Sequence, residues 1–323
     1  MTPRARIRRA TTPATGAPSP GGQDAGAGGT GTGGTGTGAA GAGRTDTRRR
    51  IPRERLPLPA LLLAVLAITF FALPLIGLLW RAPWSQAGRI LTDPAVRKAL
   101  RLSLICSLWA TALSLLFGVP LSWLLARIRF PGRSLVRALC TLSMVVPPVV
   151  GGVALFAALG RRGLVGQWLD RWFDLRLPFS TAGVVVAQTF VAMPFLVLTV
   201  ESALRQHDRR LEEAARTLGA SAWYTFRRVT LPAVRPAVVA GAVLAWARAL
   251  GEFGATITFA GNFPGRTQTL PIATYLALET DPADAVMLSL VLIATSFAVL
   301  VGLRDRWLGA GEAMPAIDSG SSR

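Results

Sequence analysis

The sequence predicts an all-α, polytopic membrane protein with about six transmembrane helices. Of its 323 residues, 51% are hydrophobic and only 16% are charged, whereas about a quarter of the residues of a soluble domain are charged. Six apolar stretches follow one another, each of about 20 residues, the length that crosses a bilayer as a helix. None of them contains a run of charges, and helices satisfy every backbone polar group within lipid.

The first 55 residues form a zone of different composition. Gly, Ala and Thr dominate residues 21–43, and ten arginines flank this part. Such a segment cannot bury enough apolar surface to fold, so we expect residues 1–55 to be a disordered cytoplasmic tail. The Gly-rich run lacks the lysine of a phosphate-binding loop, which excludes that function. A basic tail that touches anionic lipid is the alternative to a tail without a partner.

The six apolar stretches set the order of the elements in the membrane domain, residues 56–306. A single stretch of this kind also fits a buried helix of a soluble protein, but six in one chain do not. A short cytoplasmic tail, residues 307–323, follows the last of them. The expected spans are residues 58–80, 99–126, 135–159, 181–203, 236–260 and 285–303.

The basic residues between the spans predict the orientation in the membrane. With the N-terminus inside, the cytoplasmic segments hold 24 Lys and Arg and the outer segments hold 10. Because cytoplasmic loops are enriched in these residues, both termini are expected in the cytoplasm. The same distribution accounts for the net charge of +18 without a nucleic-acid partner, and membrane lipid is the expected surrounding.

The loop at residues 204–235, between the fourth and fifth spans, predicts a cytoplasmic helix–turn–helix. Asp208 can cap a first helix, and Gly219 lies where a helix commonly ends. Ser221 can cap a second short helix, which Pro232 would end. One side of the hairpin is small and apolar and the other carries arginines, which fits docking into a groove on a partner protein. An amphipathic loop that lies on the membrane is the alternative.

A pattern in this loop resembles the EAA loop of ABC importer permeases. Its members, which we call the EAA-like pattern, are Glu213, Ala214, Ala215, Gly219, Val229, Leu231 and Pro232. The one departure is Val229, where isoleucine is usual. The resemblance implies a type I ABC importer permease fold in a bacterial cytoplasmic membrane. It also implies that the loop couples to a separate ATPase, with Glu213 and Gly219 as the central positions.

The same resemblance implies the partners. Because the chain contains no G-x-x-x-x-G-K-[ST] pattern, ATP and Mg²⁺ are expected on a separate pair of ABC ATPase subunits, and no cofactor on this chain. Two ATPases need two coupling loops, which makes a homodimer the simplest arrangement. An extracytoplasmic oxyanion-binding protein completes the complex.

The chain has only two cysteines and one histidine, which are too few for a metal site or a Cys–His catalytic pair. We therefore expect no metal site and no enzyme.

The fifth apolar stretch contains a candidate translocation site. Arg248 and Glu252 are four residues apart and would share one helix face. Charges within a span are costly unless they are paired or face water. The pair is therefore either part of a gate or path, or an ion pair that locks helix packing. Small and hydroxyl-bearing residues beside it are further path candidates: Gly251, Gly254, Thr256 and Thr258.

The third apolar stretch contains Pro147 and Pro148, which interrupt the hydrogen bonds of a helix and kink it. A kink can lie beside a pore or can only shape the bundle. The resemblance favours the pore, because the family has a similar PPVV-x-G pattern near its translocation path.

Residues 246–262 and 267–271 resemble the molybdate-type permeases of this family. Sulfate and tungstate permeases share the GEFGA core, which alone implies only a tetrahedral oxyanion. The ITFAGN and TQTLP pieces favour molybdate, and the resemblance covers residues 58–303. We therefore expect a permease that moves molybdate by alternating access. Sulfate, thiosulfate and tungstate are the alternative solutes, and an ion-gradient-driven secondary transporter is the alternative of another class.

Overall fold

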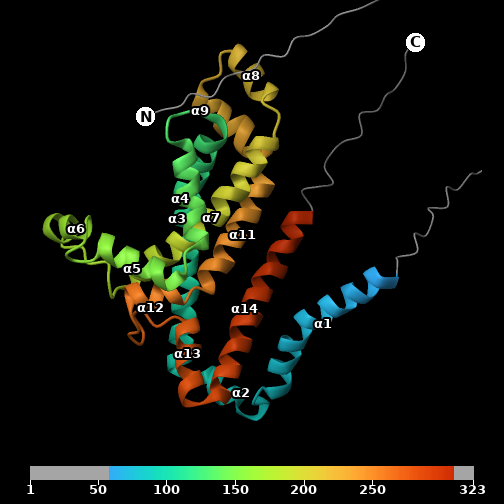
Figure 1. Cartoon of the computed structure of the whole chain (residues 1–323), viewed down its shortest axis with the longest axis vertical. Helices are drawn as coiled ribbons and strands as arrows, with labels where there is room; N and C mark the ends of the chain where they lie inside the picture. The colour runs from blue at the N-terminus through green and yellow to red at the C-terminus, as the bar shows by residue number, and fades with distance from the viewer. Residues whose placement is uncertain (1–57, 309–323) are drawn as a thin grey trace, which may run out of the picture. The chain divides into compact units, whose positions relative to one another are not determined.

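The computed structural model describes residues 58–308, and no strand occurs among them (Figure 1). The predicted tail at residues 1–55 and most of the one at 307–323 lie outside the described residues. Besides a short turn at Trp84–Gln86 and a π-helical segment, η2, at Phe226–Thr230, the elements are α-helices. In chain order they are α1 (Leu58–Arg81), α2 (Ala87–Thr92), α3 (Pro94–Arg127), α4 (Arg133–Val145), α5 (Pro148–Leu159), α6 (Gly166–Phe173), α7 (Thr181–Gln206), α8 (Arg210–Thr217), α9 (Ala222–Thr225), α10 (Leu231–Ala233), α11 (Arg235–Leu250), α12 (Gly254–Ala260), α13 (Leu270–Thr280) and α14 (Pro282–Leu308).

Four helices are long and apolar enough to cross a membrane: α1, α3, α7 and α14. Ala222–Ala233 and Arg235–Leu250 together form a fifth candidate, bent by 73°. The four long helices cover the predicted spans at residues 58–80, 99–126, 181–203 and 285–303.

The predicted third span, residues 135–159, consists of two helices instead of one. α4 ends at Val145 and α5 begins at Pro148, and each is shorter than the roughly 20 residues that cross a bilayer. The two prolines cause the break, since proline lacks an N–H group and keeps the residue before it out of the helical conformation. Val146 and Pro147 are accordingly extended, with ψ angles of 130° and 134°. The expected kink is thus a complete interruption.

The predicted fifth span, residues 236–260, is also interrupted. α11 ends at Leu250 and α12 begins at Gly254. The Glu252 carboxylate accepts a hydrogen bond from the Ala255 N–H at 2.8 Å, which satisfies one of the free N–H groups at the start of α12. The spacing predicted that Glu252 shares one continuous helix face with Arg248. Glu252 lies instead in the break between the two helices.

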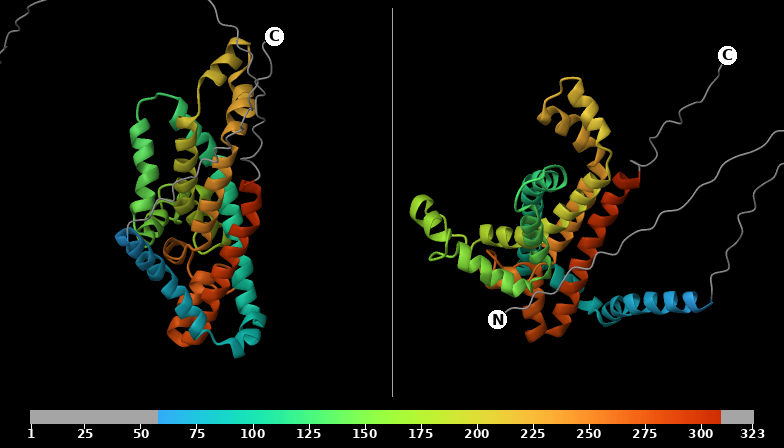
Figure 2. Two further views of the ribbon diagram at one scale, coloured as in Figure 1. Left: turned by 90° about the vertical axis from the view of Figure 1, so that its right-hand side faces the viewer. Right: turned by 45° about the horizontal axis from the view of Figure 1, so that its top comes forward.

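The helices α3, α7 and α11 pack side by side and form the largest buried cluster (Figures 1 and 2). Small residues allow them to approach: a Cβ at Gly118 of α3 would lie 2.9 Å from the Leu196 side chain of α7. A Cβ at Gly241 of α11 would lie 3.2 Å from the Cα of the same residue, Leu196. Close packing of this kind stabilises helix pairs in lipid. By contrast, α1 contains no buried residue and contacts α14.

Candidate functional site

The loop between α7 and α11 folds as the predicted helix–turn–helix (Figure 1). Gly219 has a φ of 85°, which glycine adopts without strain, and it turns the chain after α8. Ser221 caps the second helix as expected, since its hydroxyl accepts from the Tyr224 N–H at 3.2 Å. The N-cap of α8 is Arg209 and not the expected Asp208, which lies one residue earlier and accepts from the Arg210 N–H at 3.0 Å.

The second helical arm of the loop is longer than predicted. Helical turns continue from α9 through η2 and α10 to Ala233, so the prediction that Pro232 ends this helix is wrong. Pro232 lies inside this run, two residues after the π-helical segment η2. The chain bends by 73° only after Ala233. Val229, Leu231 and Pro232 consequently lie on the arm that leads into α11.

The EAA-like pattern contributes an exposed surface around α8. Glu213, Ala214 and Gly219 are exposed, and Ala215 is half-buried. An exposed apolar patch with a charged rim is typical of a surface that binds another protein. Large apolar side chains are exposed in the same loop: Leu211, Leu218, Trp223 and Tyr224.

A buried ion pair joins this loop to the C-terminal end of α3. Arg127 Nη2 lies 2.7 Å from Glu212 Oε1, and the two side chains are only 6% and 8% exposed. This pair was not predicted, because the EAA-like pattern contains the neighbouring Glu213 and not Glu212. The partners are 85 residues apart, so no local spacing reveals them.

Two further contacts hold the loop on α3. The Arg209 guanidinium donates to the Ala126 carbonyl at 3.1 Å. Trp123 of α3 packs edge-on against Phe226 of η2, with 5.7 Å between the ring centroids. Both arms of the loop are therefore attached to the end of α3.

A second buried carboxylate, Glu201, lies near the C-terminal end of α7. It forms ion pairs with Arg137 of α4 and with Arg205, the latter at 2.9 Å. None of these residues was predicted to belong to a site. They join α4 to α7 and thereby hold one half of the interrupted third span.

The residues predicted to line a path meet where α5 packs on α12. A Cβ at Gly152 would overlap Thr258 Oγ1, and one at Gly254 would lie 2.9 Å from Pro148 Cβ. The Thr258 hydroxyl donates to the Gly254 carbonyl at 2.8 Å. The structure therefore brings Pro148, Gly254 and Thr258 together, although the first is about a hundred residues from the others.

The predicted ion pair between Arg248 and Glu252 is present. Arg248 Nη1 lies 2.6 Å from Glu252 Oε2, with side-chain exposures of 28% and 1%. Since Glu252 also caps α12 through Ala255, a single carboxylate joins α11 to α12 across the break. These contacts favour the interpretation that the ion pair locks helix packing. They also place two charged side chains at the break between α11 and α12.

The remaining path candidates differ in exposure. Gly251 and Pro147 are exposed, whereas Thr256 is fully buried. Within residues 58–308, the Thr256 hydroxyl has no hydrogen-bond partner. Thr256, one of the predicted path residues, thus lies in the packed interior.

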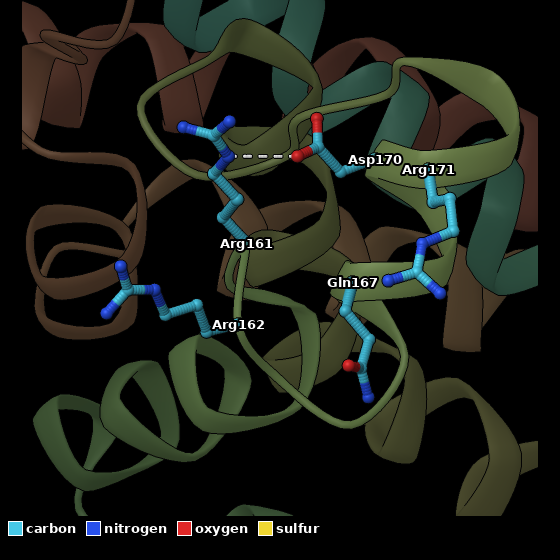
Figure 3. Close-up of a pocket in the computed structure, with 5 residues that line it drawn as sticks. All are labelled: Arg161, Arg162, Gln167, Asp170 and Arg171. Carbon is cyan, nitrogen blue, oxygen red and sulfur yellow. Dashed lines mark hydrogen bonds and ion pairs between the residues drawn. The ribbon is translucent and has the colours of Figure 1, made fainter.

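A polar cavity of about 570 Å³ lies in the segment between α5 and α7 (Figure 3). Arg161 Nε donates to Asp170 Oδ2 at 2.9 Å, and Arg176 Nε donates to Asp170 Oδ1 at 2.7 Å. The hydrogen bonds from Arg176 and then Arg161 hold the pKa of Asp170 below its ordinary value of 3.8. Basic groups outnumber acidic ones here, so the site attracts anionic groups. The residues that line the cavity are Arg161, Arg162, Gln167, Asp170 and Arg171.

Residues 118–311 match the family described as binding-protein-dependent transport system inner membrane component. The Molybdenum transport system permease protein ModB of Mycobacterium bovis is 46% identical over 237 residues, which cover 73% of this chain and 89% of that protein. The Sulfate transport system permease protein CysT of Escherichia coli is 37% identical over 235 residues, with coverages of 72% and 84%.

A solved structure shares the fold. It is a crystal structure of a bacterial ABC transporter involved in the import of the acidic polysaccharide alginate, and it matches with a TM-score of 0.62. The match covers 79% of this chain and 96% of that one at 20% identity. The match therefore confirms the predicted all-α permease fold. At this identity it does not indicate the solute.

Proposed function

The chain belongs to the family of binding-protein-dependent transport system inner membrane components, and on that premise we propose that it is the permease subunit of an ATP-driven molybdate importer. One observation carries the choice of solute: the chain is 46% identical to a molybdenum permease and 37% identical to a sulfate permease over nearly equal lengths. Sulfate, thiosulfate and tungstate have related shapes and charges, and they are the alternative solutes.

The energy comes from a separate pair of ATPase subunits, which bind ATP and Mg²⁺. The absence of a G-x-x-x-x-G-K-[ST] pattern from the sequence supports an ATP site on a separate chain. Contact with the ATPase is made by the exposed surface around Glu213 and Gly219. The apolar side chains beside it support docking into a groove.

The working complex contains two copies of this chain and a binding protein on the outer side. Two ATPases acting on one coupling loop each are the basis for the dimer. Its interface and the lipid together cover the apolar surface of helices such as α1, which has no buried residue. Both termini are cytoplasmic, as the excess of basic residues in the inner segments supports. The arginine-rich cavity next to α6 then faces outward, toward the binding protein.

Transport occurs by alternating access, and the breaks between α4 and α5 and between α11 and α12 border the path. Irregular backbone at membrane depth is tolerated only inside protein or beside water, which supports a location next to the path for Pro147, Pro148 and Gly251. ATP binding favours one of two global states, and hydrolysis allows the return. In this scheme the bridge from Arg248 through Glu252 to α12 holds the break in one shape while α11 moves.

Uptake of radioactive molybdate by vesicles that contain the whole complex tests the choice of solute. We expect ATP-dependent uptake that an excess of unlabelled molybdate suppresses more strongly than an equal excess of sulfate does. Purified binding protein is added in saturating amount, so that the comparison includes the complete system. Stronger suppression by sulfate or tungstate would assign the permease to that anion.

A further inference from the structure

We propose that Arg127 and Glu212 are positioning residues that make α3 move as one body with the coupling loop. This inference rests on the proposed function, because it concerns how a movement of the ATPase reaches the membrane helices. The loop is continuous in sequence with α7 and α11 only. The ion pair adds a third connection, from α8 to the end of α3.

The positions of adjacent side chains on α8 support this role. Neighbouring residues of an α-helix are rotated by about 100° from each other, and here Glu213 is exposed while Glu212 is buried against Arg127. One side of α8 is therefore open to the ATPase and another is fixed to α3. A movement that the ATPase imposes on the exposed side of α8 therefore reaches α3 through the ion pair.

Stability alone does not account for the pair. Two charges lose their hydration on burial, and the attraction between them compensates only when the geometry is excellent and the remaining polar groups are satisfied. Within the described part of the chain, Nε and Nη1 of Arg127 are buried without a hydrogen-bond partner. A pair with unused buried donors contributes little net stability, whereas it still fixes the relative position of two helices.

The N-terminal part of α3 contacts α13, and through it the movement reaches the end of the bundle opposite the loop. α3 has 34 residues, or roughly 50 Å at 1.5 Å per residue. Near its beginning, the buried Ser103 hydroxyl accepts a hydrogen bond from the Leu270 N–H at 2.7 Å. Leu270 is the first residue of α13, so α3 links the coupling loop to the helical hairpin of α13 and α14 (Figure 1).

Reversal of the two charges tests the proposal in vesicles that contain the complete complex with ATPase and binding protein. We compare Arg127→Glu, Glu212→Arg, the double reversal and the conservative variant Glu212→Gln, and we measure molybdate taken up per ATP hydrolysed. Each single reversal should lower this ratio about tenfold, a typical coupling between distant sites, and the double reversal should restore most of it. The ATPase should still copurify with Glu212→Gln, because the exposed docking surface is unchanged.

The exposed pair of Arg89 and Asp284, 66% and 34% exposed, is the matched control. Asp284→Arg should leave the ratio within about twofold of the wild type, as expected for a surface pair. The proposal is overturned if single reversals keep the wild-type ratio, or if the double reversal assembles normally and stays uncoupled. A wild-type complex without ATP-dependent uptake would instead refute the proposed function itself, and the inference with it.

Cross-linking keeps the test decisive if the reversed variants do not fold. Arg127→Cys and Glu212→Cys are combined in a background with Cys106→Ala and Cys140→Ala, and a bifunctional thiol reagent as long as the original pair joins the two positions. Because the proposal states that α3 and α8 move together, the joined protein should retain at least about half of its uptake. A block of uptake on cross-linking, reversed by a reductant with a cleavable reagent, would overturn the proposal.

Discussion

Glu212 and Glu213 are neighbours in sequence, but Glu213 is exposed and Glu212 is buried against another helix. The pattern of small residues and glycine identified the loop and its exposed Glu213. The buried partner of Glu212 is Arg127, which belongs to another helix. An ion pair across 85 residues is a property of the packed structure, so no spacing rule could predict it.

Gly219 tests the shape of the coupling loop. Gly219→Val forces a β-branched residue to adopt a φ of 85°, so we expect the turn after α8 to shift and uptake per ATP to fall about tenfold. Gly265→Val is the matched control, because Gly265 also has a positive φ, of 74°, and open space around it. Vesicle uptake measures both variants. Equal losses of uptake in the two would show that backbone strain alone is responsible.

The Arg248–Glu252 pair tests the role of the break in the fifth span. Arg248→Ala leaves the buried Glu252 without its partner, which should destabilise the protein by about 3 kcal/mol. Glu252→Ala should impair uptake more, since it also removes the cap of α12. Thermal unfolding in detergent and vesicle uptake are measured for both variants and for the double replacement. Equal, wild-type uptake in all three would remove the pair from the mechanism.

At the scale of elements, the apolar stretches predicted where helices form but not where they stop. The third and fifth stretches are long enough for one span each, yet both consist of two helices. Length does not distinguish these cases, because each stretch is long enough for one span whether or not its helix is interrupted. Pro147 and Pro148 indicate the break between α4 and α5 in the sequence itself. The second break depends on the Glu252 cap and on packing against α5, which appear only in the folded chain.

The contact between α5 and α12 gives a prediction at this scale. In Gly152→Ala the new methyl group would overlap Thr258 Oγ1, so the two short helices must separate, at a cost of about 1–3 kcal/mol. Gly77→Ala is the control, because that helical glycine has no neighbour within 4 Å and alanine favours helices. Unfolding in detergent should show a loss only for Gly152→Ala. The packing account fails if the two variants are equally stable.

The network around Asp170 gives a pH dependence for the segment that contains α6. Because Arg176 and Arg161 lower the pKa of Asp170 in the folded state, its contribution to stability is present above the ordinary value of 3.8. It is lost only as the pH falls from there through the lowered pKa. The difference in melting temperature between the wild type and Asp170→Asn should therefore be the same at pH 7 and pH 5. A difference that shrinks between these values would contradict the assigned ion pairs.

At the scale of the whole molecule, composition and charge distribution predicted most of the architecture. Few charges and repeated apolar stretches predicted an all-α membrane protein, and the fold shared with an ABC importer agrees with it. Orientation rests on the distribution of Lys and Arg, because a helical bundle by itself does not indicate which side is inside. The arrangement of two copies and the ATPases depends on contacts between chains, which the sequence of one chain does not contain.

The central claim is that this permease moves its solute only when a separate ATPase drives it. The most direct measurement compares molybdate accumulation in vesicles that contain the purified chain alone with vesicles that contain the complete complex. Both are tested with internal and external ATP, and both with an imposed proton or sodium gradient. Accumulation is expected only with the complete complex and ATP. Accumulation by the isolated chain in response to an ion gradient would contradict it and favour a secondary transporter.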